Sequence, residues 1–350
     1  MEPLRPHLQP MLARLARELP RGDYLYEPKW DGFRCLVFRD EDHVDLRSRR
    51  DRSLTRYFPE LAEAVAALPQ RRLVLDGEIV AVGREGFDFE ALMTRLHPAA
   101  SRVARLRRET PASFIAFDIL AEGQDDLRGV PFEQRRGRLE QVLATVGPPT
   151  QLTPITDDPA VAEEWLERFQ GVGIDGVVAK ARSLTYQPGK RAMVKVKLER
   201  TLECVVAGYR PYVDSPVVAS LLLGLYDEEG TLQHVGVASQ FSDRQREELR
   251  EELSSLIVPL ERHPWKEGFL LGGGSVGRLA GSAGRWTPDM AHDWVPLRPE
   301  RVCEVAYDHV DGVRFRFPVR FRRWRPDRTP HSCTIDQLEV SRPEVPGLAG

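Results

Sequence analysis

The hydrophobic pattern of the chain changes near Leu202. Before that residue, short strand-like apolar runs alternate with segments whose apolar residues recur at helical spacing. After it, short β-rich runs follow one another, and only Asp243–Leu256 has the clear pattern of a helix. A chain of 350 residues can bury two hydrophobic cores. We therefore predict two domains, residues 1–200 and 201–350.

The first part is expected to be an α+β domain with mixed or antiparallel sheets and flanking helices. Apolar runs rich in β-branched and aromatic residues predict strands at Cys35–Phe38, Leu73–Val82, Ser113–Ile119, Gly176–Ala179 and Val194–Leu198. Helical spacing and proline at helix starts predict helices at Arg56–Leu68, from Pro131 onward and at Pro159–Phe169, the last capped by Asp157 or Asp158.

The second part is expected to be a small β-barrel. Strands are predicted at Cys204–Tyr209, Ser220–Tyr226, His234–Val237, Arg301–Tyr307 and Arg314–Phe321. Several short strands around one helix are typical of an oligonucleotide-binding (OB) fold. The glycine-rich stretch Gly268–Gly284 predicts a mobile loop, and the tail beyond about Pro330 is expected to pack little.

The composition excludes several protein classes. With 41% hydrophobic and 29% charged residues, the chain is expected to fold. No apolar run approaches the roughly 18 residues of a membrane span, and the N-terminus lacks a secretory pattern. The four cysteines are far apart in sequence without a C-x-x-C pair, so isolated structural thiols are expected rather than a zinc or disulfide framework.

The charge is unevenly distributed along the chain. A net charge of -3 argues weakly against a general nucleic-acid binder. However, Arg314–Arg328 contains seven arginines and one acid, Asp327, which suits phosphate contact. This strip is also interpreted as an amphipathic edge strand. Its inward residues would be Phe315, Phe317, Val319 and Phe321, and its outward residues Arg314, Arg316, Arg320 and Arg322.

Lys29 lies in a segment that suits a nucleophile. It precedes Asp31-Gly32 and an apolar strand, with Arg34 two residues after the glycine. An amine attacks phosphorus only when unprotonated, so burial or nearby cations would have to lower the pKa of Lys29 from about 10.4. The alternative is a solvated lysine before a hairpin turn at Asp31-Gly32, which a lone K-x-D-G match favours.

Other charged segments favour the nucleophile. Glu78 follows a strand in Asp-Gly-Glu, Asp175 begins Asp-Gly-Val-Val-Ala-Lys, and Lys195 and Lys197 share a strand face. Nucleotidyl transfer needs cations for the triphosphate and carboxylates for a divalent metal. The sequence has no Walker-type glycine loop, so side chains would have to hold the phosphates.

The order of these motifs is specific. The chain contains K-x-D-G-x-R, D-G-E, F-D-hydrophobic, D-G-V-V-x-K and K-x-K, then R-F-x-R-W-R-P-D-R. The set resembles the covalent nucleotidyltransferase superfamily, and within it the ATP-dependent DNA ligases, especially the stand-alone bacterial ligase C type and the ligase module of bacterial end-joining proteins. The resemblance runs from about Pro10 to Pro330. It implies an adenylation domain followed by an OB-fold domain.

The resemblance also implies roles for individual residues. Lys29 would be the adenylated nucleophile, Arg49 would contact the 5′-phosphate of a nick, and Phe117 would stack on adenine. Taken alone, Phe117 could be a core residue and Glu78 an ordinary strand-end carboxylate. The remaining implied contacts are Glu27, Arg34, Glu78, Lys180, Lys195 and Lys197 for the nucleotide, Glu78 and Asp175 for a metal, and Arg325, Asp327 and Arg328 for orienting pyrophosphate.

The function expected from the resemblance is ATP-dependent sealing of 3′-hydroxyl and 5′-phosphate ends in DNA repair. The expected cofactors are ATP and Mg²⁺ or Mn²⁺, and the expected substrate is nicked double-stranded DNA. A monomer in the cytoplasm, associated with the nucleoid and not with a membrane, is expected, with Ku-like or primase-polymerase proteins as candidate partners. The alternatives are an RNA ligase or capping-type nucleotidyltransferase, and a catalytically silent DNA-binding repair scaffold. NAD⁺ is a less favoured donor because only about 28 residues precede Lys29.

Overall fold

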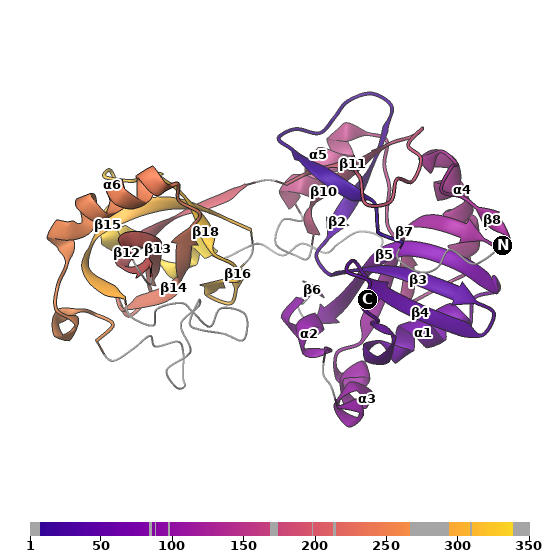
Figure 1. Cartoon of the computed structure of the whole chain (residues 1–350), viewed down its shortest axis with the longest axis horizontal. Helices are drawn as coiled ribbons and strands as arrows, with labels where there is room; N and C mark the ends of the chain where they lie inside the picture. The colour runs from indigo at the N-terminus through magenta and orange to yellow at the C-terminus, as the bar shows by residue number, and fades with distance from the viewer. Residues whose placement is uncertain are drawn as a thin grey trace. The chain divides into compact units, whose positions relative to one another are not determined.

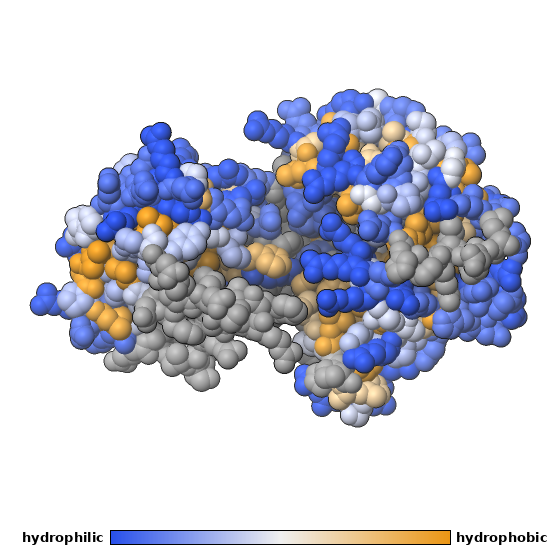
Figure 2. Space-filling model, viewed as in Figure 1, coloured by the Kyte–Doolittle hydropathy of each residue, from blue (hydrophilic) through white to orange (hydrophobic). Residues whose placement is uncertain are grey.

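The chain folds into two compact units, and the division along the sequence falls between residues 197 and 199 (Figure 1). The computed structural model describes residues 8–83, 86–87, 89–96, 99–168, 174–197, 199–212, 215–266, 294–308 and 310–338. The division falls close to the predicted one, and the assignment of residues 1–200 and 201–350 as functional domains stays a prediction. No helix within these ranges is long and apolar enough to cross a membrane. In the view of Figure 2 the described surface is mostly hydrophilic, with hydrophobic residues in small groups.

The first unit contains two sheets. In the larger sheet the described strands run in the order β4 (His43–Ser48), β3 (Phe33–Asp40), β5 (Arg72–Gly83), β7 (Ala112–Glu122) and β8 (Asp125–Asp126), with β6 (Gly86–Phe87) on β5 and β9 (Thr150–Leu152) on β7. The smaller sheet has the order β1 (Leu12–Ala16), β11 (Arg191–Val196), β10 (Ile174–Ala181) and β2 (Tyr24–Trp30). Most pairs are antiparallel, but β1 pairs with β11 and β9 with β7 in parallel.

Helices α1 (Pro59–Ala66), α2 (Phe89–Thr94) and α4 (Phe132–Leu143) pack against the larger sheet. Helix α5 (Pro159–Arg168) packs on β2 and β10 of the smaller sheet, where its Ala162 and Leu166 are buried. A further helix, α3 (Ala100–Glu109), buries Val103 and Leu106. The predicted helix Arg56–Leu68 is a 3-10 turn followed by α1, because Pro59 starts the α-helix at its first turn. Pro131 caps α4, and the Asp158 carboxylate accepts a hydrogen bond from the backbone N–H of Ala160, 2.8 Å away, as expected for a cap.

Two hydrophobic layers position the strands. One lies between the larger sheet and α1 and α4, where Leu61, Leu139 and Phe114 are fully buried. The other lies between the two sheets and joins Leu36 of β3 to Met193 of β11. Because strand β7 is covered on both faces, its apolar run is almost continuous rather than alternating. The second layer packs the two sheets face to face, which brings distant motifs together.

The second unit is a closed five-stranded barrel among the described residues. Its strands are β12 (Arg200–Tyr212), β13 (Ser215–Tyr226), β14 (Leu232–Ser239), β18 (Val319–Trp324) and β15 (Val295–Tyr307), each paired with the next and β15 with β12. Helix α6 (Asp243–Leu253) begins with a capping box in which Ser242 and Gln245 exchange hydrogen bonds. This topology agrees with the predicted OB fold.

The predicted edge strand Arg314–Phe321 is wrong in two respects. It is split into β17 (Arg314–Phe315) and β18, with Pro318 between them, and proline lacks the N–H that a ladder requires. Strand β18 is also not an edge, because it pairs with both β14 and β15 to close the barrel. Phe315 and Val319 face the core as predicted, but Phe317 is 55% exposed.

The C-terminal tail packs more closely than predicted. Residues Pro330–Ser332 and Ile335–Leu338 form 3-10 turns, and Cys333 between them is fully buried. The Cys333 carbonyl accepts a hydrogen bond from the N–H of Tyr226 at 2.8 Å. This contact fixes the start of the tail against the barrel. The predicted loop Gly268–Gly284 lies outside the described residues.

The four cysteines are free and buried, as expected for structural thiols. They are not all isolated, however, because Cys204 of β12 and Cys303 of β15 lie opposite each other in the barrel. The described residues contain no cluster of three or more potential metal-ligating side chains. Thus the cysteines contribute to the hydrophobic cores.

Candidate functional site

Lys29 lies near the end of β2, where the chain crosses between the two sheets. Strand β2 pairs with β10, whereas β3 pairs with β4 and β5, so Asp31-Gly32 does not form the hairpin turn considered above. A Cβ atom on Gly32 would lie 2.2 Å from the carbonyl oxygen of Ile79. Glycine is therefore required for the chain to pass close to β5.

The ammonium group of Lys29 is held by a carboxylate from the smaller sheet. Its Nζ lies 2.6 Å from Oδ2 of Asp175, a residue 146 positions away in sequence, and Lys197 pairs with the same oxygen. Burial alone would lower the pKa of Lys29, but Asp175, helped by Glu78 and Asp31, outweighs burial and raises it. The prediction of a lowered pKa for Lys29 is therefore wrong for this arrangement.

A different lysine of the group has a lowered pKa. Burial lowers the pKa of Lys195, and repulsion from the neighbouring cations Lys29 and Lys197 lowers it further. Lys29, Lys195 and Lys197 therefore all interact with one carboxylate, that of Asp175. Three ammonium groups around one carboxylate leave positive charge that a polyphosphate would neutralise.

These residues border a cavity of about 400 Å³ in the first unit, a volume typical of small-molecule sites. The cavity brings together eight of the residues singled out from the sequence. They are Glu27, Lys29, Arg34, Arg49, Glu78, Phe117, Lys180 and Lys195. Asp175 and Lys197 join the group through the ion pairs with Lys29 and with each other.

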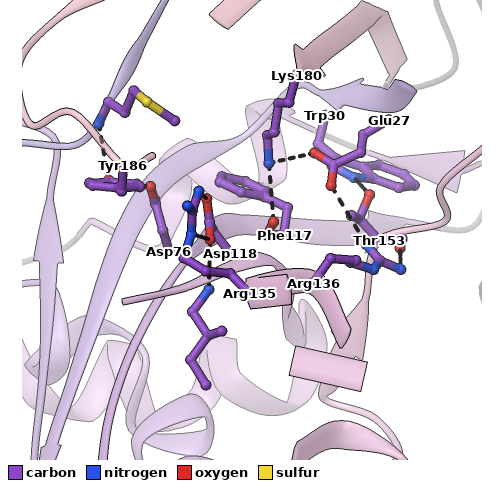
Figure 3. Close-up of polar contacts among 12 residues, drawn as sticks. Glu27, Trp30, Asp76, Phe117, Asp118, Arg135, Arg136, Thr153, Lys180 and Tyr186 are labelled. Atoms are coloured by element: carbon purple, nitrogen blue, oxygen red, sulfur yellow. Dashed lines mark hydrogen bonds and ion pairs between the residues drawn. The ribbon is translucent and has the colours of Figure 1, made fainter. Parts of the chain in front are cut away.

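Arg34 is anchored by two residues that the sequence argument did not assign to the site. Its guanidinium donates two hydrogen bonds to the buried carboxylate of Asp76, at 2.6 and 2.7 Å, and lies 4.4 Å from the centre of the Phe117 ring. The hydroxyl of Tyr186 donates to the same carboxylate at 2.6 Å (Figure 3). The first residue of the Asp-Gly-Glu motif was the available signal for Asp76. Tyr186 had no such signal.

Lys180 lies in the cavity wall, with its Nζ 4.9 Å from the centre of the Phe117 ring. Its Nζ is 2.7 Å from Oε2 of Glu27 and donates to the carbonyl of Phe117 at 3.1 Å, with only 2% of the residue exposed (Figure 3). Burial raises the pKa of Glu27, and Lys180 opposes that effect. The ammonium is thus paired with protein partners in this structure, and its contact with a nucleotide stays a prediction.

Glu78 is a second carboxylate of the cavity wall whose pKa is raised. It lies on β5 directly opposite Arg34 of β3. Burial raises the pKa of Glu78 to about 7, although Arg34 and Lys29 pull it down. Near neutral pH this group therefore exchanges between an acceptor-only carboxylate and a neutral acid.

The arginines at the end of the barrel belong to the second unit. Arg325 is paired with Asp327 at 2.7 Å and also with Glu203 and Glu304. The hydrogen bond from Arg325 holds the pKa of Asp327 low, at about 2. Arg328 is exposed. Arg325 and Asp327 therefore act on each other in this unit, and Arg328 is accessible.

Comparison with known families matches residues 10–197 to the ATP dependent DNA ligase domain and residues 214–328 to the ATP dependent DNA ligase C terminal region. The chain belongs to the ATP-dependent DNA ligase family. Its two matched regions follow the two units of the fold, an adenylation domain and an OB-fold domain. The family resemblance of the motifs is therefore confirmed, and with it the use of ATP.

Individual relatives extend over the whole chain. DNA ligase C2 of Mycolicibacterium smegmatis is 51% identical over 340 residues, 96% of each chain. DNA ligase C of Mycobacterium tuberculosis is 48% identical over 356 residues, 99% of each chain. A solved Lig E DNA ligase shares the fold, with a TM-score of 0.55 at 17% identity over 90% of this chain and 99% of that one. These similarities favour a DNA ligase over the RNA ligase, capping and scaffold alternatives.

Proposed function

We propose that this DNA ligase seals nicks between a 3′-hydroxyl and a 5′-phosphate through AMP carried on Lys29. The observation that carries the proposal is the cavity itself. Lys29 lies in its wall with an aromatic ring, Phe117, and a second lysine, Lys195, in the same wall. A nucleophile, a surface for a base and cations for phosphates are the parts that lysine adenylylation requires.

The reaction would proceed by three displacements at phosphorus. The unprotonated Nζ of Lys29 attacks the α-phosphorus of ATP, a P–N bond forms, and the P–O bond to pyrophosphate breaks. An oxygen of the 5′-phosphate at the nick then attacks the same phosphorus and the P–N bond breaks. Finally the 3′-hydroxyl, losing its proton, attacks the 5′-phosphorus, and AMP leaves. Holding both DNA ends in one site supplies proximity.

The first displacement requires the proton of Lys29 to leave. The ammonium is paired with Asp175, whose carboxylate raises the pKa of Lys29. Loosening that pair leaves burial as the dominant effect, and burial favours the neutral amine. We propose that binding of the nucleotide shifts Asp175 away from Lys29, so that Asp175 controls when Lys29 becomes a nucleophile.

The other cavity residues have roles that follow from their charge and location. Phe117 would stack on adenine and Arg34, fixed by Asp76, would contact the ribose. Arg49, exposed at the end of β4, is accessible to the 5′-phosphate of a nick. The remaining proposed contacts are Glu27 with adenine, Lys180, Lys195 and Lys197 on the nucleotide side, and Arg325, Asp327 and Arg328 with pyrophosphate.

Glu78 and Asp175 fit a divalent cation such as Mg²⁺ or Mn²⁺. Mg²⁺ is commonly held by one or two carboxylates together with substrate phosphates, so two carboxylates beside a cation-rich cavity form a suitable donor set. A bound cation would supply charge stabilisation at the phosphate oxygens. Both carboxylates act electrostatically on Lys29, so their occupation would also weaken their hold on its proton.

Several wider features stay predictions. Nicked double-stranded DNA is the proposed substrate, in DNA repair. A monomeric state, association with the nucleoid in the cytoplasm, and binding to Ku-like or primase-polymerase proteins are likewise proposed. They require solution experiments on the full chain.

The proposal is tested by incubating the protein with ATP labelled in its α-phosphate and Mg²⁺. The full chain should acquire label, and pyrophosphate should remove it. Lys29→Ala should acquire none, whereas Lys190→Ala, which changes an exposed lysine of the same unit, should be labelled normally. Persistence of the label in Lys29→Ala would contradict the assignment. Sealing of nicked DNA compared with nicked RNA then tests the substrate.

A further inference from the structure

A second buried cation lies behind the cavity. Arg136 of α4 is 6% exposed and stands outside every motif used above. Its Nη2 donates to the carbonyl of Thr153 at 2.8 Å, and its Nε donates to Glu140 at 2.8 Å. Its Nη1 lies 3.5 Å from Oε1 of Glu27 (Figure 3). Arg136 is therefore fixed on one side and faces the Glu27 carboxylate on the other.

The two oxygens of Glu27 have different environments. Oε2 pairs with Lys180 at 2.7 Å. Oε1 is buried and accepts no hydrogen bond from any residue that the structure describes, and the facing Nη1 of Arg136 is in the same condition. Leaving such atoms unsatisfied costs about 1–3 kcal/mol each. Glu27 is nevertheless part of the cavity wall, so its carboxylate lies next to a bound ligand.

The chemistry of this acceptor distinguishes the purines. Adenine carries a 6-amino group, which donates hydrogen bonds, whereas guanine carries a carbonyl oxygen at that position, which a carboxylate repels. A carboxylate discriminates well only if it stays ionised and keeps one orientation. Burial raises the pKa of Glu27, and both Lys180 and Arg136 oppose this effect.

We infer that Arg136 is a positioning residue that holds Glu27 in place to recognise the 6-amino group of adenine. Arg136 is not part of the cavity wall, so it acts through Glu27 and not on the nucleotide itself. The inference rests on the proposed function, because it takes the cavity as the site of ATP. It adds a determinant of base selectivity that lies 107 residues beyond Lys29 in sequence, on helix α4.

The test combines a change in the protein side chain with a change in the nucleotide base and compares the resulting dissociation constants. Dissociation constants for ATP and for purine riboside triphosphate, which lacks the 6-amino group, are measured in full chains that carry Lys29→Ala, so that binding is not followed by reaction. A hydrogen bond to a charged group predicts that loss of the amino group weakens binding roughly 10- to 100-fold. In Arg136→Met this ratio should fall below about 3-fold.

Two further variants serve as controls. Arg138→Met changes an arginine on the exposed side of α4 that pairs with Glu122, and it should leave the ratio unchanged. Arg136→Lys keeps a buried cation but loses the planar fork whose separate N–H groups reach Thr153, Glu140 and Glu27, so the ratio should fall at least twofold. If Arg136→Met does not fold, as judged by its melting curve, Arg136→Lys carries the test.

The outcomes separate the inference from the proposed function. Equal weakening of both nucleotides in the Arg136 variants, or an unchanged ratio, would overturn the positioning role and leave the ligase proposal intact. Failure of either nucleotide to bind the chain with intact Arg136 would instead count against the cavity as the ATP site. A ratio near one before any change at Arg136 would show that Glu27 does not read the amino group.

Discussion

The raised pKa of Glu78 makes this residue a source of instability at alkaline pH. Its pKa is about 7 in the folded protein against 4.5 for an ordinary glutamate, because burial disfavours the charged form. Between these two values the folded state binds more protons than the unfolded state. The contribution of Glu78 to stability therefore falls as pH rises through this window and is least favourable above pH 7.

The size of the effect follows from the two pKa values. Each pKa unit corresponds to 1.36 kcal/mol, so the shifted titration of Glu78 costs the first unit about 3 kcal/mol at pH 8 and about 1 kcal/mol at pH 5. Glu78→Gln keeps the shape and removes the charge. We expect it to stabilise the first unit by these amounts, which corresponds to a rise in melting temperature of roughly 6–12 °C at pH 8. The same variant should lose nick sealing.

This prediction is tested by comparing the thermal unfolding of Glu78→Gln with that of the unchanged chain at pH 5 and pH 8. The control is Glu167→Gln, an exposed glutamate on α5 of the same unit, which should change the free energy of unfolding by less than about 0.5 kcal/mol at either pH. A stabilisation by Glu78→Gln that is equal at both pH values, or a destabilisation at pH 8, would refute the reasoning. Loss of activity together with gain of stability would mark Glu78 as retained for function.

Three further changes test other parts of the site. Asp175→Asn should lower the pKa of Lys29, because burial then dominates, and so move the rise of self-adenylylation with pH toward lower pH; an unmoved profile in label incorporation would contradict the ion pair. Phe117→Leu keeps an apolar side chain but loses the aromatic face, so the KM for ATP should rise roughly 5- to 100-fold, and an unchanged KM would argue against stacking. Gly32→Ala places a Cβ 2.2 Å from a carbonyl oxygen of β5 and should destabilise the protein by about 1–3 kcal/mol in urea unfolding, whereas Gly137→Ala, with open space around its Cβ, should not.

The apolar strands and the two-part layout could be predicted from the sequence. The predicted strand at Ser113–Ile119 corresponds to β7, whose buried run is too hydrophobic to be anything but internal. Elements with little apolar signal were missed. Strand β2 contains Glu27, Pro28 and Lys29 and forms because β10 pairs with it, and α3 buries only Val103 and Leu106. Local propensity is weak there, so tertiary contacts decide the structure.

The family, the nucleophile and the charged partners could be proposed from motif order, because nucleotidyl transfer demands those residue types wherever they lie in space. Motif order did not predict the protonation of Lys29, the anchoring of Arg34 by Asp76 and Tyr186, or the position of Arg136. Each depends on contacts between residues far apart in sequence. The sign of a pKa shift is the balance of burial against a particular neighbour, and that neighbour is known only once the two sheets have packed together.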